Sequence, residues 1–290
     1  EDNIVPGSYI RIWPNGRRQS VPSSYGQLDK NAILPTEANA LIKHISSAAR
    51  RLKIKKPAAV WPNPLSNRVY LPDLYKQYFD GGWDGSTWLS SEWLADKDNS
   101  KEKIFPILGI YDHPAKQRQV VFQLDTNQNS GNLLIFGSSG TGKSTLLRTL
   151  TISIARSFSP KEGWIYVLDY GGQSSLKVIE KLPHVGAVVT RFELERTIRL
   201  IRFVHNQIIT RGERLRKSKV DHWIDYNRSE NPENRLPAIY VVLDNYLAFK
   251  QAFQEEPEIL NQFTTLVNGG PACGIFLVIT SSLQSDIPSE

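Results

Sequence analysis

From about residue 104 onward, short uninterrupted apolar runs alternate with segments of helical periodicity, which leaves few folds open to this chain. A continuous apolar run is typical of a strand covered on both faces, as in parallel sheets with helices on each side. Strands that alternate with helices form such a sheet through right-handed crossovers. We therefore expect an α/β fold with a mainly parallel sheet flanked by helices. The predicted strands are Leu133–Phe136, Ile165–Leu168, Val185–Val189, Ile239–Leu243 and Ile275–Ile279, and the clearest helical patterns are Ser144–Ser157 and Glu193–Leu215.

The residues before this alternation have a different character. Residues 1–35 contain one strand-like segment, Tyr9–Trp13, followed by a turn signal and a stretch rich in Ser, Pro and Gly. We expect them to be a linker or the tail of a preceding domain. Residues 36–105 are expected to be a linker that begins with a helix capped by Thr36 and ending before Pro57. Its predicted apolar stripe is Leu41, Ile42, Ile45, Ala49 and Leu52.

The later part of this linker is rich in Pro, Gly and Trp. Trp83, Trp88 and Trp93 are five residues apart, a spacing that fits neither a helix face nor a strand. Large aromatic rings usually pack, so we expect them to hold the linker against the neighbouring domain. An exposed aromatic platform is the alternative.

Composition excludes several classes of protein. The single cysteine, Cys273, excludes an internal disulfide framework and a zinc ribbon. No apolar run approaches the roughly 18 residues that a membrane helix needs. No spacing suited to a metal cluster is present among the histidines, which are His44, His113, His184, His205 and His222.

The net charge is +6, and the basic excess is concentrated between Arg191 and Lys219. A basic face can bind nucleic acid, although such a run is also typical of a solvated helix. Apolar residues recur within it at helical spacing: Leu194, Ile198, Ile201, Val204 and Ile208. We therefore expect one buried face, with the arginines facing outward.

Residues 137–144 match the pattern G-x-x-x-x-G-K-[ST] at every fixed position, between a predicted strand and a predicted helix. Glycines let backbone N–H groups wrap phosphate oxygens, and the helix N-terminus adds a favourable partial charge. Lys143 would bridge the β- and γ-phosphates of ATP, and the Ser144 hydroxyl would ligate Mg²⁺. The predicted nucleotide-binding residues are Gly137, Ser138, Ser139, Gly140, Thr141, Gly142, Lys143, Ser144 and Thr145.

Such a site also needs a carboxylate at the end of a neighbouring strand. Asp244 follows Ile239–Leu243 and would hold the magnesium through its outer shell. The next position usually carries a glutamate that deprotonates the attacking water, and here it is Asn245. An amide cannot accept that proton at neutral pH, so we expect binding to persist and hydrolysis to suffer.

Weaker candidates accompany these residues. Asp169 ends a predicted strand and either lies beside the nucleotide or is a turn carboxylate. Thr280 either senses the γ-phosphate or caps its strand. Arg191 and Arg196 are candidates for an arginine finger acting on a neighbouring subunit, with an ordinary surface charge as the alternative.

Four segments together resemble the FtsK/SpoIIIE-type ATPases of type VII secretion, the EssC/EccC proteins. They are Gly137–Leu150 (GSSGTGKSTLLRTL), Val167–Gly172 (VLDYGG), Leu182–Gly186 (LPHVG) and Val241–Asn245 (VVLDN). The LPHVG element and the Asp-Asn pair are similar to the second or third ATPase domain of these proteins. Upstream, Val60–Pro62 and Leu71–Leu74 resemble the segment that leads into such a domain, and Pro6–Ile10 the tail of the domain before it.

This resemblance implies a RecA-like core at residues 106–290, C-terminally incomplete, that binds ATP and Mg²⁺. It also implies a membrane-anchored, hexameric motor with further ATPase domains in the same chain, on the cytoplasmic side of the cell membrane, which exports small helical-hairpin proteins. Two alternatives remain: a DNA translocase of the same superfamily and an ATP-stabilised structural module. DNA pumps carry Asp-Glu and a winged-helix module, neither of which is seen here, so DNA is not an expected partner.

Overall fold

The computed structural model describes residues 8–22, 36–55, 57, 64–78, 82–83, 85, 88–89, 106–123, 131–172 and 176–286. The chain divides into two compact units, residues 1–60 and 61–290. The segment boundaries expected near residues 35 and 105 stay predictions about domain organisation. Trp93 lies outside the described residues.

In the first unit, a hairpin precedes a helix. Strand β1 (Ser8–Ile12) pairs antiparallel with β2 (Arg18–Pro22), and the turn signal lies between them. The first strand was predicted and the second was not. Helix α1 (Glu37–Arg51) begins as predicted, because the Thr36 hydroxyl accepts from the Asn39 backbone N–H. Its apolar stripe is exposed, with Leu41, Ile42 and Ile45 each about 60% accessible.

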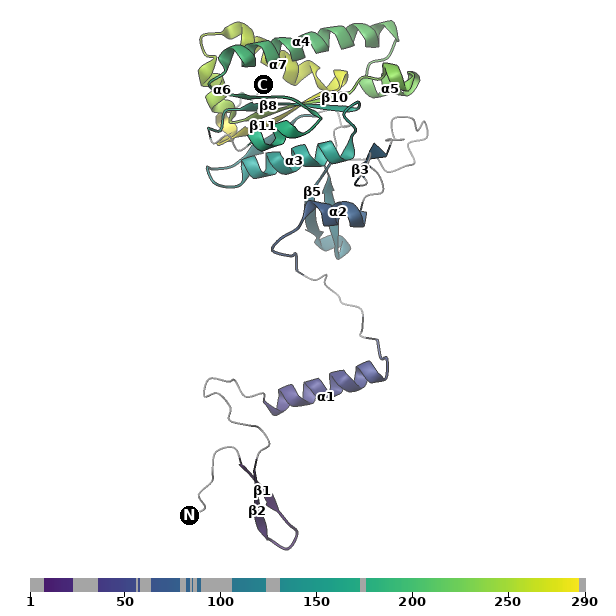
Figure 1. The fold of residues 1–290 in the computed structure, drawn as a ribbon, viewed down its shortest axis with the longest axis vertical. Helices are drawn as coiled ribbons and strands as arrows, with labels where there is room; N and C mark the ends of the chain where they lie inside the picture. The colour runs from purple at the N-terminus through teal and green to yellow at the C-terminus, as the bar shows by residue number, and fades with distance from the viewer. Residues whose placement is uncertain are drawn as a thin grey trace. The chain divides into compact units, whose positions relative to one another are not determined.

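The second unit contains the predicted parallel sheet (Figure 1). All five predicted strands are confirmed, with ends that differ by at most two residues. In spatial order they are β7 (Leu133–Phe136), β11 (Ile275–Ser281), β10 (Ala238–Asp244), β8 (Gly163–Asp169) and β9 (Val185–Thr190). Every neighbouring pair is parallel, so the carboxyl ends of all five strands lie at one edge.

Helices cover both faces of this sheet. Helix α3 (Lys143–Ser157) packs on one face, and α4 (Leu194–Lys217) and α7 (Pro257–Gly269) lie on the other (Figure 1). The central strand β10 supplies both cores by alternation: Ile239, Val241 and Leu243 join one apolar cluster, and Tyr240 and Val242 join the other. This explains the continuous apolar runs of the sequence. The remaining helices are α5 (Trp223–Ser229) and α6 (Tyr246–Ala252), with 3₁₀ turns η2 (Pro114–Lys116), η3 (Lys177–Lys181), η4 (Pro232–Asn234), η5 (Pro271–Cys273) and η6 (Gln284–Asp286).

A smaller layer precedes the sheet in sequence. It consists of α2 (Leu71–Tyr78), the pair β3 (Gly82–Trp83) and β4 (Trp88–Leu89), and the hairpin β5 (Ile107–His113) and β6 (Arg118–Gln123). Leu74, Tyr75 and Ile107 form its own buried cluster. The Tyr75 hydroxyl donates to the Ser153 carbonyl oxygen of α3 at 2.9 Å and lies 2.8 Å from Ser157 Oγ. This contact joins α2 to the helix that follows the glycine-rich loop.

Helix α4 carries most of the basic excess, and its burial differs in part from the expectation. Ile201 and Val204 are buried as predicted, but Leu194 is 44% exposed. The prediction that the arginines face outward is wrong for Arg211, whose side chain is only 1% exposed. The helical spacing of apolar residues shows which face is buried, but it does not indicate that an arginine also lies on that face.

Two structural features are absent from the described ranges. None of the helices there combines the length and the apolar character needed to cross a bilayer. No group of three or more His, Cys, Asp or Glu side chains is arranged there to hold a metal ion.

Replacing Tyr75 by Phe tests the contact between α2 and α3. The substitution removes a buried hydroxyl that hydrogen-bonds to Ser153 and Ser157, so we expect the free energy of unfolding in urea to fall by about 1–2 kcal/mol. Tyr70→Phe is the control, because Tyr70 is 58% exposed, and surface changes usually stay within about 0.5 kcal/mol. Equal stability of the two variants would contradict the assigned role of Tyr75.

Candidate nucleotide-binding site

The glycine-rich loop connects β7 to α3 at the edge where the strands end. Ligands of open parallel sheets bind outside the carboxyl ends of the strands, so the loop has the expected position. Gly140 and Gly142 have positive φ angles of 79° and 96°, which favour glycine. At Gly137 a Cβ would lie 2.6 Å from Thr141 Oγ1. The loop therefore needs its glycines for conformation and for close approach.

Lys143 closes over this loop. Its Nζ donates to the carbonyl oxygens of Gly137 at 2.6 Å and Ser138 at 2.9 Å. The Thr141 hydroxyl also donates to the Ser138 oxygen, at 2.8 Å. The ammonium group is thus held beside the loop backbone, where the phosphates of a nucleotide would bind.

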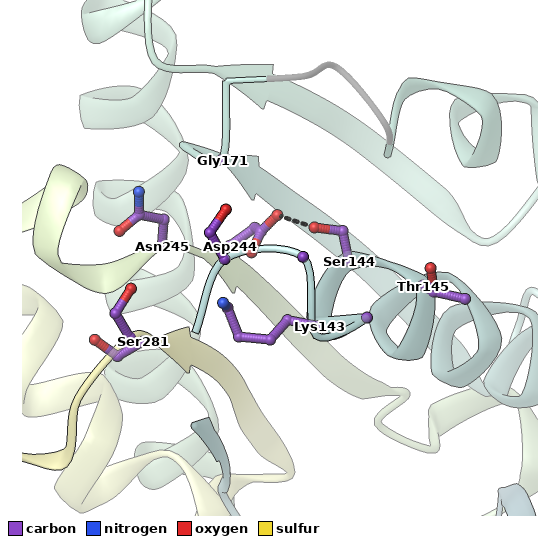
Figure 2. A pocket seen from close by; sticks show the side chains of 11 residues that line it. Lys143, Ser144, Thr145, Gly171, Asp244, Asn245 and Ser281 are labelled. Carbon is purple, nitrogen blue, oxygen red and sulfur yellow. Dashed lines mark hydrogen bonds between the residues drawn. The ribbon is translucent and has the colours of Figure 1, made fainter. Parts of the chain in front are cut away.

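Asp244, at the end of β10, joins three elements. Its Oδ2 accepts from the Ser144 hydroxyl of α3 at 2.8 Å, and its Oδ1 accepts from the Thr280 hydroxyl of β11 at 2.6 Å. The first of these bonds is drawn in Figure 2. Asp244 is only 3% exposed, so these hydroxyls replace water at the carboxylate. The two residues predicted to hold magnesium, Ser144 and Asp244, are therefore in direct contact.

Asn245 has its side chain engaged in the protein. Its φ of 69° lies in the left-handed region, which Asn tolerates better than most residues. Its Oδ1 accepts from the Ala248 backbone N–H at 3.3 Å and so caps α6, while Nδ2 points to the Tyr170 carbonyl oxygen at 3.5 Å. The sequence revealed the missing glutamate but gave no sign of this capping role.

Asp169 lies beside Asp244, because β8 and β10 pair these two residues in register. It is 3% exposed; Oδ1 accepts from the Gly171 N–H at 3.2 Å, and Oδ2 has no hydrogen-bond partner among the described residues. Burial, and then the Asp244 carboxylate, raise the pKa of Asp169 above its usual value. Asp169 thus lies near the site without lining its pocket, and the two roles expected for it stay predictions.

A pocket of about 340 Å³ opens between these groups. Figure 2 shows Lys143 and Ser144 on one side of it and Asn245 and Ser281 on the other. Of the predicted nucleotide-binding residues, Gly137, Ser138 and Thr141 do not line it. Three residues that line the pocket were not predicted from the sequence: Gly171, Ser281 and Ser282. Of these, only Gly171 belongs to a segment that the sequence analysis singled out, Val167–Gly172. The lining consists of Ser139, Gly140, Gly142, Lys143, Ser144, Thr145, Gly171, Asp244, Asn245, Ser281 and Ser282.

Thr280 was expected either to sense the γ-phosphate or to cap its strand, and both roles stay predictions. It is fully buried and absent from the pocket wall, and its hydroxyl accepts from the Asn245 N–H at 2.9 Å while donating to Asp244. This geometry favours a residue that positions the carboxylate. The neighbouring Ser281 and Ser282 line the pocket instead.

The two arginine-finger candidates lie on the exposed surface. Arg191 stacks over the Phe192 ring at 4.7 Å, and Arg196 forms an ion pair with Glu193. Neither lines the pocket of its own chain. An arginine finger acts on a neighbouring subunit, so both assignments stay predictions.

Three features define a P-loop NTPase-like fold. They are the five-stranded parallel sheet, the glycine-rich loop between a strand and a helix, and the carboxylate at the end of another strand. Residues 102–284 match the FtsK/SpoIIIE family, and the protein belongs to this family. The sequence resemblance to its type VII secretion members is confirmed.

The chain is similar to the type VII secretion protein EssC of Staphylococcus aureus (strain MRSA252), with 29% identity over 257 residues. That alignment covers 88% of this chain but 16% of EssC. Among solved structures, it is similar to ATPases 2 and 3 of Thermomonospora curvata EccC in complex with a signal sequence peptide. The TM-score is 0.59 with 30% identity, over 67% of this chain and 35% of that one. The cytoplasmic domain of the same EccC shares the fold, with a TM-score of 0.69 and 24% identity over 98% of this chain and 32% of that one.

Thr280→Val tests the assignment of Thr280 as a positioning residue. Valine keeps the shape but leaves the partly buried Asn245 N–H and one Asp244 oxygen without a partner, so we expect a loss of about 1–3 kcal/mol in the free energy of unfolding. Thr280→Ser, which keeps the hydroxyl, serves as the matched variant and should be the more stable of the two. The opposite order in chemical denaturation would show that the hydroxyl is dispensable.

Proposed function

We propose that residues 106–290 bind Mg-ATP in the pocket between the glycine-rich loop and Asp244, and that they hydrolyse it weakly or not at all. The observation that carries this proposal is the convergence of Lys143, Ser144 and Asp244 on one pocket at the carboxyl edge of the sheet. Membership of an ATPase family supports it.

The residues present fit a magnesium ion. Ser144 Oγ and Asp244 Oδ2 are 2.8 Å apart, and hydroxyl and carboxylate oxygens are the hard ligands that Mg²⁺ prefers. Ser144 would contact the ion directly, and Asp244 would hold its coordinated water. When bound, the ion neutralises charge on the β- and γ-phosphate oxygens.

Lys143 and the loop would bind the phosphates. The ammonium group would exchange its hydrogen bonds to the carbonyl oxygens of Gly137 and Ser138 for contacts with the β- and γ-phosphates. The exchange is favourable because a phosphate carries full negative charge, whereas a carbonyl oxygen carries only a partial one. Thr280 keeps Asp244 in place throughout.

The site lacks the usual general base for hydrolysis at position 245. An amide cannot take a proton from water, and the Asn245 amide oxygen is already used to cap α6. Loss of a general base typically lowers the rate by about 10²–10⁴-fold. Electrostatic stabilisation by Lys143 would leave residual turnover.

The biological setting of the proposal rests on the relatives. The chain spans 16% of EssC, so the activity of a whole secretion protein is proposed for it only as part of a longer chain. We propose a domain within a membrane-anchored type VII secretion motor, on the cytoplasmic side of the membrane, assembled as a homo-hexamer. Its partners would be other ATPase domains of the same chain and small helical-hairpin substrates, with DNA not expected.

Asn245 also supports a second role, an ATP-stabilised structural module. In that role the bound nucleotide would strengthen the domain within a tandem array without a turnover step. The two roles differ in their rates of phosphate release and agree in their nucleotide affinity.

Lys143→Ala tests nucleotide binding. Loss of a charge-assisted contact should weaken Mg-ATP binding by about 1.5–3 kcal/mol, or roughly 10–150-fold, measured by calorimetry. Lys116→Ala is the control, because Lys116 is exposed in η2 and outside the pocket. Equal affinity of the parent and Lys143→Ala would refute the site.

Steady-state phosphate release at saturating Mg-ATP tests the proposal of weak hydrolysis. We expect turnover by the parent chain well below about 1 s⁻¹, the low end of typical enzymes. Asn245→Glu supplies the usual base, and an increased rate in this variant would assign the defect to position 245. Calorimetry on both proteins separates a change in chemistry from a change in binding. A parent rate of about 1 s⁻¹ or more would show that another group acts as the base.

A further inference from the structure

A second pocket lies on the opposite edge of the sheet, where the strands begin. Its volume is about 750 Å³, and three parts of the chain form its walls: Pro160–Trp164 before and within β8, Gln207–Arg214 of α4, and Pro232–Pro237 before β10. Strands β8 and β10 each contain seven residues, which corresponds to about 23 Å at about 3.3 Å per residue. The pocket is therefore well separated from the site of the proposed function.

The lining of this pocket is strongly basic. Lys161, Arg211, Arg214 and Arg235 supply four cationic side chains, and Glu233 is the one acidic residue among them. None of the four cations forms an ion pair with a described residue. The pocket thus carries a positive charge that the described part of the chain does not balance.

Arg211 is the deepest of these groups. It is 1% exposed, its Nη1 donates to the Cys273 carbonyl oxygen at 3.0 Å, and its Nε has no hydrogen-bond partner in the described structure. A buried arginine is normally paired with a carboxylate, because an uncompensated charge is costly away from water.

The groups around Arg211 do not supply that counter-charge. Burial lowers the pKa of Arg211 to about 10, which leaves it cationic at neutral pH. The charged and titratable groups that act on this pKa are Cys273, Arg214 and Tyr166. Burial raises the pKa of both Cys273 and Tyr166, so these two stay neutral, and Arg214 is a like charge.

We propose that this pocket binds an oxyanion, a carboxylate or phosphate group of a ligand, through the exposed guanidinium group of Arg214 and the unpaired positive charge of the buried Arg211. The planar guanidinium fork matches both of these anions. Arg235 and Lys161 add charge at the wall, although Arg235 Nε is already bonded to the Asn227 carbonyl oxygen at 3.1 Å. The ring of Trp164, whose indole N–H donates to the Pro160 oxygen at 3.1 Å, provides an apolar wall for the rest of the ligand.

Two probes distinguish the sources of such an oxyanion. Glutarate represents the side-chain carboxylate of a polypeptide, and inorganic phosphate represents a phosphorylated ligand. Calorimetric titrations use the 290-residue chain carrying Lys143→Ala, which weakens phosphate binding to the glycine-rich loop. The comparison with variants of Arg211 and Arg214, which lie outside the nucleotide pocket, then separates this test from the proposed function.

We expect saturable binding of at least one probe, weakened about tenfold or more by Arg211→Met, which removes the charged fork from a site of similar volume. Arg214→Ala should weaken it too. Arg214 is exposed, so this variant decides the question even if Arg211→Met fails to fold. The control is Arg216→Ala, an exposed residue of the same helix outside the pocket, which should leave the affinity unchanged.

Selective binding of glutarate would assign the site to a polypeptide carboxylate, and selective binding of phosphate would assign it to a phosphorylated ligand. Both results support the proposal. It is overturned if neither probe binds, or if binding is the same in the parent, Arg214→Ala and Arg216→Ala.

Discussion

The Asp244 carboxylate is the group on which the arrangement of the nucleotide pocket depends. It ends the central strand and accepts one hydrogen bond from α3, through Ser144, and one from β11, through Thr280. The Thr280 hydroxyl in turn accepts from the Asn245 backbone, which fixes the start of α6. Two strands and two helices thus meet at one buried anion, whose desolvation is balanced by hydroxyl donors from the protein. A cation beside Asp244 would enter a site that is already organised.

Much of the fold could be predicted from the sequence because helices cover both faces of the sheet. Strands such as Ile239–Leu243 must be apolar throughout when helices pack on each side, so continuous runs identified them. The glycine-rich loop was equally clear, because its conformation demands glycine at Gly140 and Gly142. In contrast, β2 has no run of apolar residues, and it was missed.

The finer features of the sites depend on contacts between distant residues, which periodicity does not report. The capping of α6 by Asn245 is a case, since it depends on a left-handed backbone conformation that a strand pattern does not signal. Thr280 was expected either to sense the γ-phosphate or to cap its strand, and the sequence did not indicate that the next residue, Ser281, lines the pocket. Arg211 belongs to the basic run between Arg191 and Lys219, and nothing in the sequence distinguishes it from the arginines of that run that are exposed. In each example the three-dimensional neighbours decided the outcome.

The close approach of Gly171 to Asp244 limits how this pocket can change during evolution. A Cβ at this position would lie 2.5 Å from Asp244 Oδ2, so any larger residue would displace the carboxylate or the backbone after β8. The opposite wall is more permissive, because Ser282 is exposed and its side chain has room to change. A lineage that retains Asp244 is therefore free to alter its pocket at Ser282, directly after β11, whereas position 171, after β8, admits glycine alone.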